Sequence, residues 1–180
     1  MIYLIRHGEA AAGWGDALDP GLSDLGRAQA EATAAKLLEL GASPVLKSPM
    51  ARCQETASAF ETLTKTEART EIAVSEIETP QGLDDRASWL RNVMSGNWDA
   101  AGHDFTPWRQ NALAAIEALP DGSAVFSHFI AINAIVGQVL KDPRVIVFRP
   151  GHCSITCLNR NADGRLQIAE LGSEAATKIL

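Results

Sequence analysis

Two short apolar segments of this sequence each end abruptly at a histidine, and this repeated pattern constrains the fold more than any other feature. The first segment runs from Ile2 to Ile5 and is followed by Arg6 and His7. The second runs from Ser123 to Ser127, and His128 comes directly after it. Short apolar runs of this kind are typical of strands buried inside a sheet. Because ligands bind open α/β sheets at the carboxyl ends of their strands, we predict that both histidines lie at one sheet edge.

The segment that follows the first predicted strand has the pattern of a helix. Ser23 is a suitable N-cap, and Gly41 follows the last helical position. Between these limits, apolar residues recur at the spacing of one helical face. We predict that the buried face consists of Leu25, Ala28, Ala32, Ala35 and Leu38.

A second strand and a second helix follow in the same order. Val45 to Lys47 has the composition of a strand. Ser48 and Pro49 then resemble the start of a helix, an N-cap followed by the proline favoured at the first helical position. Arg52 is therefore expected in or near the first turn of this helix.

Strands and helices alternate through the rest of the chain. The pattern predicts a weak strand over Thr70–Val74, a loop over Glu76–Asp85, helices over Arg86–Met94 and Thr106–Leu119, and strands over Val145–Phe148, Ser154–Leu158 and Leu166–Leu171. Such alternation is typical of an α/β fold with helices on both faces of the sheet. We therefore predict one domain over residues 1–180, a three-layer α/β/α sandwich with a mostly parallel central sheet.

Charge and composition argue against several classes of partner. The chain has 180 residues and a net charge of -6, whereas general binders of nucleic acids or anionic membranes carry clustered Lys and Arg. Its apolar stretches are too short to cross a bilayer, and Met1 to Arg6 lacks the long apolar core of a signal peptide. Cys53, Cys153 and Cys157 match no disulfide framework. We expect a cytoplasmic protein with reduced thiols that binds neither nucleic acid nor membrane.

Four motifs of the sequence occur in a distinctive order. They are Arg6-His7-Gly8-Glu9, residues 22–30, residues 48–57 and residues 125–128. Together they resemble the motifs of the histidine phosphatase superfamily, which includes the cofactor-dependent phosphoglycerate mutases. The resemblance covers most of the chain, and it implies a phosphoglycerate mutase-like fold.

The resemblance also implies a role for the polar residues of these motifs. His7 is the residue that becomes phosphorylated, while Arg6, Arg52 and His128 surround the transferred phosphoryl group. The side-chain chemistry agrees, because guanidinium groups stay charged at physiological pH and fork onto phosphate oxygens. A neutral imidazole nitrogen can attack phosphorus if the other ring nitrogen is fixed as a donor. His128 is expected to donate a hydrogen bond to the phosphoryl group, and its cationic form would add positive charge. The family usually has glycine after this histidine, where the present chain has Phe129.

Protonation of the leaving oxygen calls for a carboxylic acid, and the sequence offers two candidates. Glu76 and Glu78 would point to the same side of an extended segment, so spacing alone does not choose between them. The family's acid commonly precedes a hydrophobic residue after the third strand. This context favours Glu76, which precedes Ile77.

These residues predict a metal-independent phosphatase that hydrolyses a small phosphomonoester through a phosphohistidine, with no cofactor. Phosphoglycerate mutase is the nearest rival activity, although Ala10 and Gly13 replace polar residues that the family's mutases carry. The motifs are also compatible with a protein phosphohistidine phosphatase and with a catalytically idle phospholigand-binding adaptor. His152, Cys153 and Cys157 do not predict a metal site, because no fourth ligand is evident. The expected partner is a small phosphorylated compound.

Overall fold

The structure is a computed structural model that describes the chain except for residues 14–18, 81, 84, 103 and 175–180. Strands and helices alternate along it, as the sequence pattern predicted. The elements are β1 Ile2–Arg6, α1 Asp24–Glu39, β2 Ser43–Lys47, α2 Ala51–Thr64, β3 Arg69–Thr70, the 3-10 helix η1 Ile72–Val74, α3 Arg86–Met94, the 3-10 helix η2 Trp98–Ala100, α4 Thr106–Glu117, β4 Ser123–Ser127, α5 Phe129–Leu140, β5 Ile155–Arg160 and β6 Leu166–Glu170.

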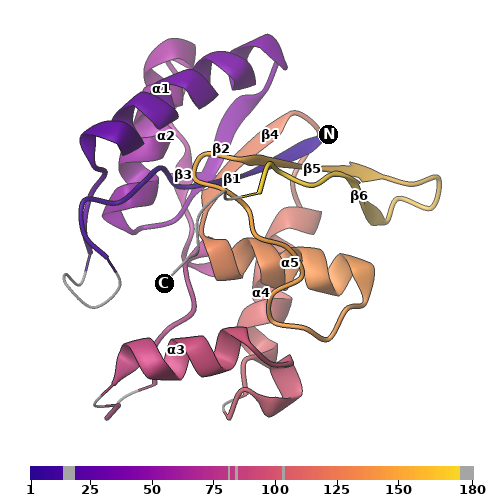
Figure 1. The fold of residues 1–180 in the computed structure, drawn as a ribbon. Coiled ribbons are helices and arrows are strands. Elements are labelled where there is room, and N and C mark those ends of the chain that lie inside the picture. The colour runs from indigo at the N-terminus through magenta and orange to yellow at the C-terminus, as the bar shows by residue number, and fades with distance from the viewer. Residues whose placement is uncertain (14–18, 81, 84, 103, 175–180) are drawn as a thin grey trace.

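Within the described residues, six strands form one mixed sheet in the order β3-β2-β4-β1-β5-β6. The first four of these strands run parallel to one another, whereas β5 and β6 form an antiparallel hairpin that pairs with β1. Helices α1 and α2 cover one face of the sheet, and α4 and α5 cover the other (Figure 1). The predicted α/β/α sandwich with a mostly parallel sheet is confirmed.

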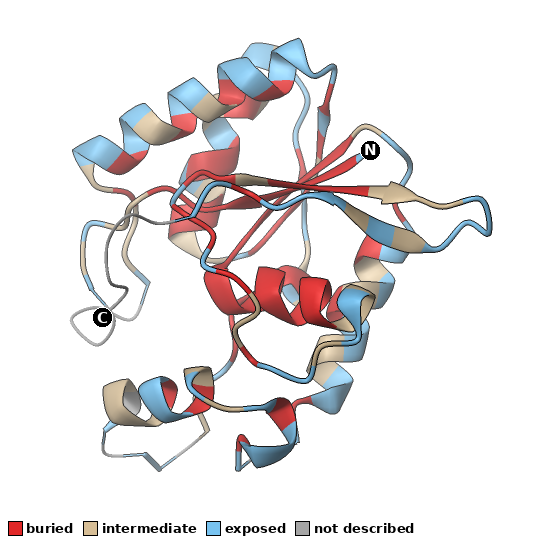
Figure 2. Cartoon of the chain, turned by 45° about the vertical axis from the view of Figure 1, so that its right-hand side comes forward, coloured by how far each residue is buried: buried red, intermediate tan, exposed pale blue. Residues whose placement is uncertain are grey.

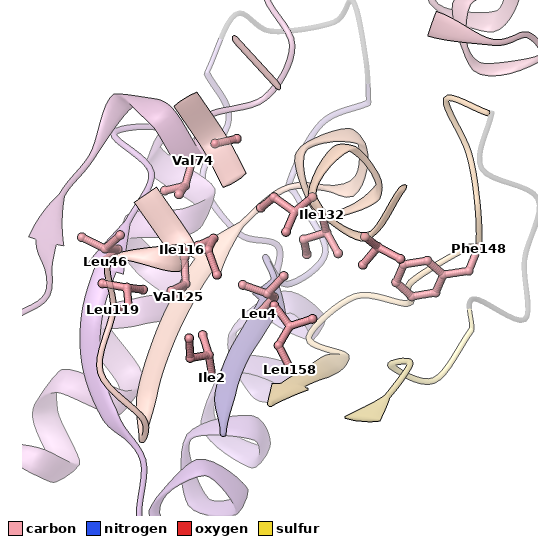
Figure 3. Close-up of a cluster of buried hydrophobic side chains, with 13 residues drawn as sticks. Ile2, Leu4, Leu46, Val74, Ile116, Leu119, Val125, Ile132, Phe148 and Leu158 are labelled. Atoms are coloured by element: carbon pink, nitrogen blue, oxygen red, sulfur yellow. The ribbon is translucent and has the colours of Figure 1, made fainter. Parts of the chain in front are cut away.

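Two hydrophobic clusters hold the helices against the sheet. The cluster under α4 and α5 joins strand residues such as Leu4 and Val125 to helix residues such as Ile116 and Ile132 (Figure 3). Helix α5 is buried over most of its length (Figure 2). None of the helices in the described part of the chain combines the length and apolar character that a bilayer span requires.

The parallel pair of β1 and β4 positions the two histidines. Arg6 pairs with Ser127 at the carboxyl ends of these strands, and the backbone N–H of His7 donates to the carbonyl of Ser127 at 3.0 Å. The residues that follow Arg6 and Ser127, which are His7 and His128, therefore lie next to each other at this sheet edge. The ring centroids of His7 and His128 lie 5.2 Å apart. The prediction that both histidines share one sheet edge is confirmed.

Helix α1 begins where the sequence predicted, but it buries a different face. The hydroxyl of its N-cap, Ser23, accepts a hydrogen bond from the backbone of Gly26, as a capping serine does. The buried residues of α1 are Gly26, Ala30, Ala34 and Leu37. The predicted face was wrong, since its members are all exposed: Leu25, Ala28, Ala32, Ala35 and Leu38. Alanines lie on both sides of this helix, so apolar spacing did not separate the buried face from the solvent face.

Other elements also differ from the prediction. Helix α2 begins at Ala51 with Met50 as its N-cap, so the preceding Ser-Pro pair lies outside it. The segment Thr70–Val74 divides between the end of β3 and η1. The predicted strand Val145–Phe148 does not form; instead, the side-chain oxygen of Asn133 accepts hydrogen bonds from the backbone of Val147 and Phe148. The side chain of Asn133, in α5, thus provides the hydrogen-bond acceptor that a neighbouring strand would have provided for these backbone amides.

The loop that follows His7 crosses the first turn of α1 at very close range. A Cβ atom added at Gly8 would lie 2.6 Å from the carbonyl oxygen of Gly26, and one added at Gly26 would collide with the carbonyl of Glu9. The neighbours are backbone atoms, which cannot swing aside as a flexible side chain can. Glycine at both positions is therefore what allows the loop and the helix to meet.

Gly26→Ala should destabilise the protein by about 1–2 kcal/mol, because overpacking typically costs ~1–3 kcal/mol while alanine gains up to ~1 kcal/mol over glycine in a helix. The steady-state rate should fall by a larger factor than the loss of folded protein explains, because the displaced loop carries His7. Thermal unfolding and steady-state rates measure the two effects. Gly96→Ala, outside a helix, is the control for an added methyl group, because a Cβ there meets no described neighbour closer than 3.9 Å. An unchanged melting temperature for Gly26→Ala would refute the close crossing.

Candidate active site

His7 is buried at the end of β1, and its surroundings fix its tautomer. Its Nδ1 lies 2.7 Å from the carbonyl oxygen of Gly8. A carbonyl only accepts, so Nδ1 carries the proton and Nε2 carries the lone pair. The Nε of Arg52 donates to this Nε2 at 3.2 Å, which agrees with that assignment. Burial, and then the positive charges around it, hold the pKa of His7 well below its usual range, so the ring is neutral.

The loop beyond His7 is held by a residue that the sequence did not single out. The hydroxyl of Thr56, one turn along α2 from Arg52, accepts from the backbone N–H of Gly8 at 3.0 Å. The same hydroxyl donates to the carbonyl of Arg52 at 2.6 Å. Thr56 thereby ties the acceptor that orients His7 to the helix that carries Arg52. The sequence signal that could have identified Thr56 is its position within the motif of residues 48–57.

Arg6 lies beside His7 with its guanidinium group partly occupied. One terminal nitrogen donates to the carbonyl of Pro150 at 2.8 Å, and the other contacts Nε2 of His152 at 2.9 Å. Its Nε is buried and has no hydrogen-bond partner within the described part of the chain. Phe129, which stands where the family usually has glycine, places its ring 5.1 Å from the guanidinium carbon. Burial lowers the pKa of Arg6 to about 10, so the group remains charged at neutral pH.

Arg52 lies in the first turn of α2, as predicted, and is buried. Besides its bond to His7, one terminal nitrogen donates to the sulfur of Met50 at 3.3 Å. The other lies 3.8 Å from a carboxylate oxygen of Asp19. Asp19 also accepts from the backbone N–H of Ala51, so it satisfies one of the open amides at the start of the helix. Asp19 is a second residue at this site that sequence reasoning missed.

His128 is fully buried at the N-cap of α5. Its Nε2 lies 2.7 Å from the hydroxyl of Ser48 and 3.3 Å from the sulfur of Cys53. Burial, with Arg52 and Arg6 nearby, holds the pKa of His128 well below its usual range. His128 is therefore neutral at pH 7, and the positive charge at the site comes from the arginines. Ser48, interpreted from sequence as a helix cap, is instead a hydrogen-bond partner of this histidine.

The two candidate carboxylates do not lie on one side, as they would in an extended segment. Glu78 is exposed whereas Glu76 is buried. The carboxylate of Glu76 accepts hydrogen bonds from the backbone of Ile77, Ile130 and Ala131 at 3.1–3.2 Å. Burial nevertheless raises the pKa of Glu76 above its ordinary value, against the opposing effect of these bonds. The structure brings Glu76, and not Glu78, to the N-terminus of the helix that follows His128.

The assembled group has a definite chemical character. Two buried guanidiniums lie near a neutral imidazole whose lone-pair nitrogen is defined, and one of them has a donor without an acceptor among the described residues. Such a set favours a tetrahedral oxyanion in contact with a nitrogen nucleophile. Among the residues that the structure describes, no cluster of three or more His, Cys, Asp or Glu side chains is arranged to hold a metal ion. The fold and the site together define a class, α/β proteins with paired histidines and arginines at the carboxyl edge of a sheet.

Comparison with known proteins identifies the family. The family described as the histidine phosphatase superfamily (branch 1) matches residues 2–172. The chain belongs to this superfamily, as its four motifs suggested. A search of curated protein sequences gave no match.

Solved structures of phosphatases share the fold at low sequence identity. A mycobacterial glucosyl-3-phosphoglycerate phosphatase superposes with a TM-score of 0.79 at 20% identity, over 97% of this chain and 99% of that one. A phosphoserine phosphatase from Entamoeba histolytica, in complex with 3-phosphoglyceric acid, gives 0.72 at 20% identity over 96% of both chains. The protein YhfR of Bacillus stearothermophilus gives 0.75 at 17% identity over 97% of both chains. The family and these neighbours support an enzyme of the phosphatase type.

Proposed function

We propose that this enzyme hydrolyses a small phosphomonoester through a phosphohistidine at His7, without a metal ion. The observation that carries the proposal is the fixed tautomer of His7, whose Nε2 lone pair accepts from the buried guanidinium of Arg52 while the charge of Arg6 also acts on the ring. The same proposal makes a small phosphorylated compound the partner and the cytoplasm the location.

In the first step the phosphoryl group is held by Arg6, Arg52 and His128, and Nε2 of His7 attacks phosphorus. The bond from phosphorus to the ester oxygen breaks, and Glu76 gives its proton to that oxygen, which leaves as an alcohol. The imidazole becomes cationic, and its Nδ1–H bond to the carbonyl of Gly8 stabilises the new charge.

In the second step a water molecule attacks the phosphohistidine. The carboxylate of Glu76 takes a proton from this water, the nitrogen–phosphorus bond breaks, and inorganic phosphate leaves. His7 returns to its neutral form. Because each guanidinium stays charged throughout, the equatorial oxygens of phosphorus are stabilised in both steps.

Substrate binding has to rearrange one contact of the free enzyme. Nε of Arg52 donates to the nitrogen that attacks, so the lone pair of His7 is occupied before substrate arrives. A phosphoryl group is a stronger acceptor for a guanidinium than a neutral imidazole is. We infer that the substrate draws Arg52 onto its oxygens and frees Nε2 for attack.

The similar proteins support a small phosphomonoester over a phosphorylated protein. Two of them are a glucosyl-3-phosphoglycerate phosphatase and a phosphoserine phosphatase, whose names specify small phosphate esters. A structure of the former in complex with VO3 shares the fold of this chain with a TM-score of 0.74 at 22% identity. Vanadate is therefore a suitable probe of the site, because its trigonal bipyramidal form resembles the transition state of phosphoryl transfer.

Incubation with a labelled phosphomonoester should give an acid-labile, base-stable phosphoenzyme, and turnover should persist in excess EDTA. Micromolar vanadate should inhibit competitively. Activity lost with EDTA and restored by magnesium or zinc would refute the metal-free mechanism. A phosphoenzyme that passes its phosphoryl group to a second alcohol rather than to water would favour the mutase. Turnover of phosphohistidine peptides alone would favour the protein phosphatase.

A further inference from the structure

The loop between α5 and β5 carries a third histidine to the side of the site. Its backbone is tied to β1, because Cys153 N–H donates to the carbonyl of Arg6 at 3.0 Å and Arg6 N–H donates to the carbonyl of Ser154 at 3.3 Å. Cys153 adopts a left-handed conformation with φ of 55°. That conformation is unfavourable for a residue with a Cβ atom, and such strain persists where the surrounding contacts impose it. The turn sets His152 directly beside the end of β1.

The side chain of His152 lies at the boundary between the buried site and solvent. Its Nε2 lies 2.9 Å from a terminal nitrogen of Arg6. Its ring centroid lies 5.9 Å from that of His7, while the residue as a whole is exposed. The side chain therefore contacts the arginine from the solvent side of the site.

The contact with Arg6 determines the protonation state of His152. A guanidinium has only donors, so Nε2 must carry a lone pair and the ring proton must be on Nδ1. Partial burial, and then the charge of Arg6, lower the pKa of His152 to about 4, against the opposing effect of Glu9. The charged and titratable groups that face it are Arg6, His7 and Glu9. The ring is therefore a neutral acceptor at pH 7.

We propose that His152 is a positioning residue that holds the guanidinium of Arg6 in place for the phosphoryl group. Three contacts define the pose: the carbonyl of Pro150, Nε2 of His152 and the ring of Phe129. They leave the buried Nε of Arg6 as a donor that has no acceptor in the part of the chain that the structure describes. Burial of an unpaired donor costs free energy in the free enzyme, and an arriving phosphoryl oxygen removes that cost. The proposal rests on the proposed function only in taking the phosphoryl group as the ligand.

His152→Ala should weaken vanadate binding about tenfold, because the loss of a hydrogen bond to a charged group lets the guanidinium move. Isothermal titration calorimetry with vanadate alone measures this without turnover. His152→Gln should recover most of the affinity, since its amide oxygen can accept from Arg6. With substrate, the alanine variant should lose about the same factor in kcat/KM, mainly through a higher KM. Arg149→Ala, an exposed change in the same loop, is the control for a general effect of side-chain truncation in this loop and should leave vanadate affinity unchanged.

Two further measurements separate positioning from a merely structural role. Long-range 1H–15N spectra of the imidazoles should show His152 as the neutral Nδ1–H tautomer at pH 7, and Arg6→Lys should alter that signature. In a double-mutant cycle, His152→Ala and Arg6→Lys should be strongly non-additive for vanadate binding. An Nε2–H tautomer, wild-type vanadate affinity in His152→Ala, or additivity would each overturn the proposal. If vanadate binding depends on His152 but no phosphoenzyme forms, the proposed function fails and this inference stands.

Discussion

Replacement of His7 by alanine should reduce turnover by at least about 1,000-fold, because no other side chain at the site is proposed to accept the phosphoryl group. Labelling with a radioactive phosphomonoester should give no acid-labile phosphoenzyme. Vanadate should still bind, since Arg6, Arg52 and His128 remain. A residual rate above about one tenth of wild type would remove His7 from the nucleophile role.

The alanine variant needs a matched control, because His7 is buried and hydrogen-bonded. Its removal leaves the carbonyl of Gly8 without a donor, a loss of ~1–3 kcal/mol in the free energy of unfolding. His7→Asn keeps an N–H near that carbonyl and has no nucleophilic nitrogen. Both variants should be inactive, and the asparagine variant should unfold at the higher temperature. If both variants lose activity to a comparable extent although their stabilities differ, the loss of activity is due to the missing nucleophile and not to unfolding.

Glu76→Gln should slow hydrolysis of an alkyl phosphate by about 100- to 10,000-fold and that of p-nitrophenyl phosphate far less, because a good leaving group needs no proton. Glu78→Gln, an exposed change two residues away, should be mild for both substrates. Single-turnover kinetics isolate the first step where dephosphorylation limits the steady state. Leaving-group dependence in the Glu78 variant instead would move the acid to that residue.

The pH profile gives a separate test of Glu76. Burial raises its pKa, so the carboxyl group keeps its proton to a higher pH than an exposed glutamate does. The first step needs the protonated form. For alkyl phosphates, kcat/KM should therefore be at its full value below the raised pKa and should decrease as the pH rises through it. In Glu76→Gln that alkaline limb should disappear, and its persistence would mean that another group titrates.

The strands and the site edge were predictable because their signals are local. A short apolar run that ends in polar residues marks β1 and β4, and parallel pairing then brings the next residue of each strand together. The face of α1 was not predictable from the same reasoning, since alanine occurs on both of its sides. The segment Val145–Phe148 has a strand-like composition, but its amide partner, Asn133, lies in a helix and left no periodic signal.

The site residues divide in the same way. Arg6, His7, Arg52 and His128 were marked by motifs, and the structure places them together. The residues that orient them were not marked, because each acts through a hydrogen bond to a residue far away in the sequence. Asp19 accepts from Ala51, Ser48 contacts His128, and Thr56 accepts from Gly8. Spacing did not separate Glu76 from Glu78, whereas the structure buries Glu76 against the start of α5 and leaves Glu78 exposed.

The sheet order has a consequence for how the chain is made. Within this sheet β1 is synthesised before the other strands, yet both of its neighbours, β4 and β5, come from residues 123–160. At a translation rate of about 5–20 residues per second, the apolar strand waits on the order of 6–25 s for its first partner to be synthesised. During that interval its edges are unpaired and open to chaperones or to aggregation. Any ribosome-bound intermediate that stops before β4 should therefore be unable to bind vanadate, whatever helical structure it has already formed.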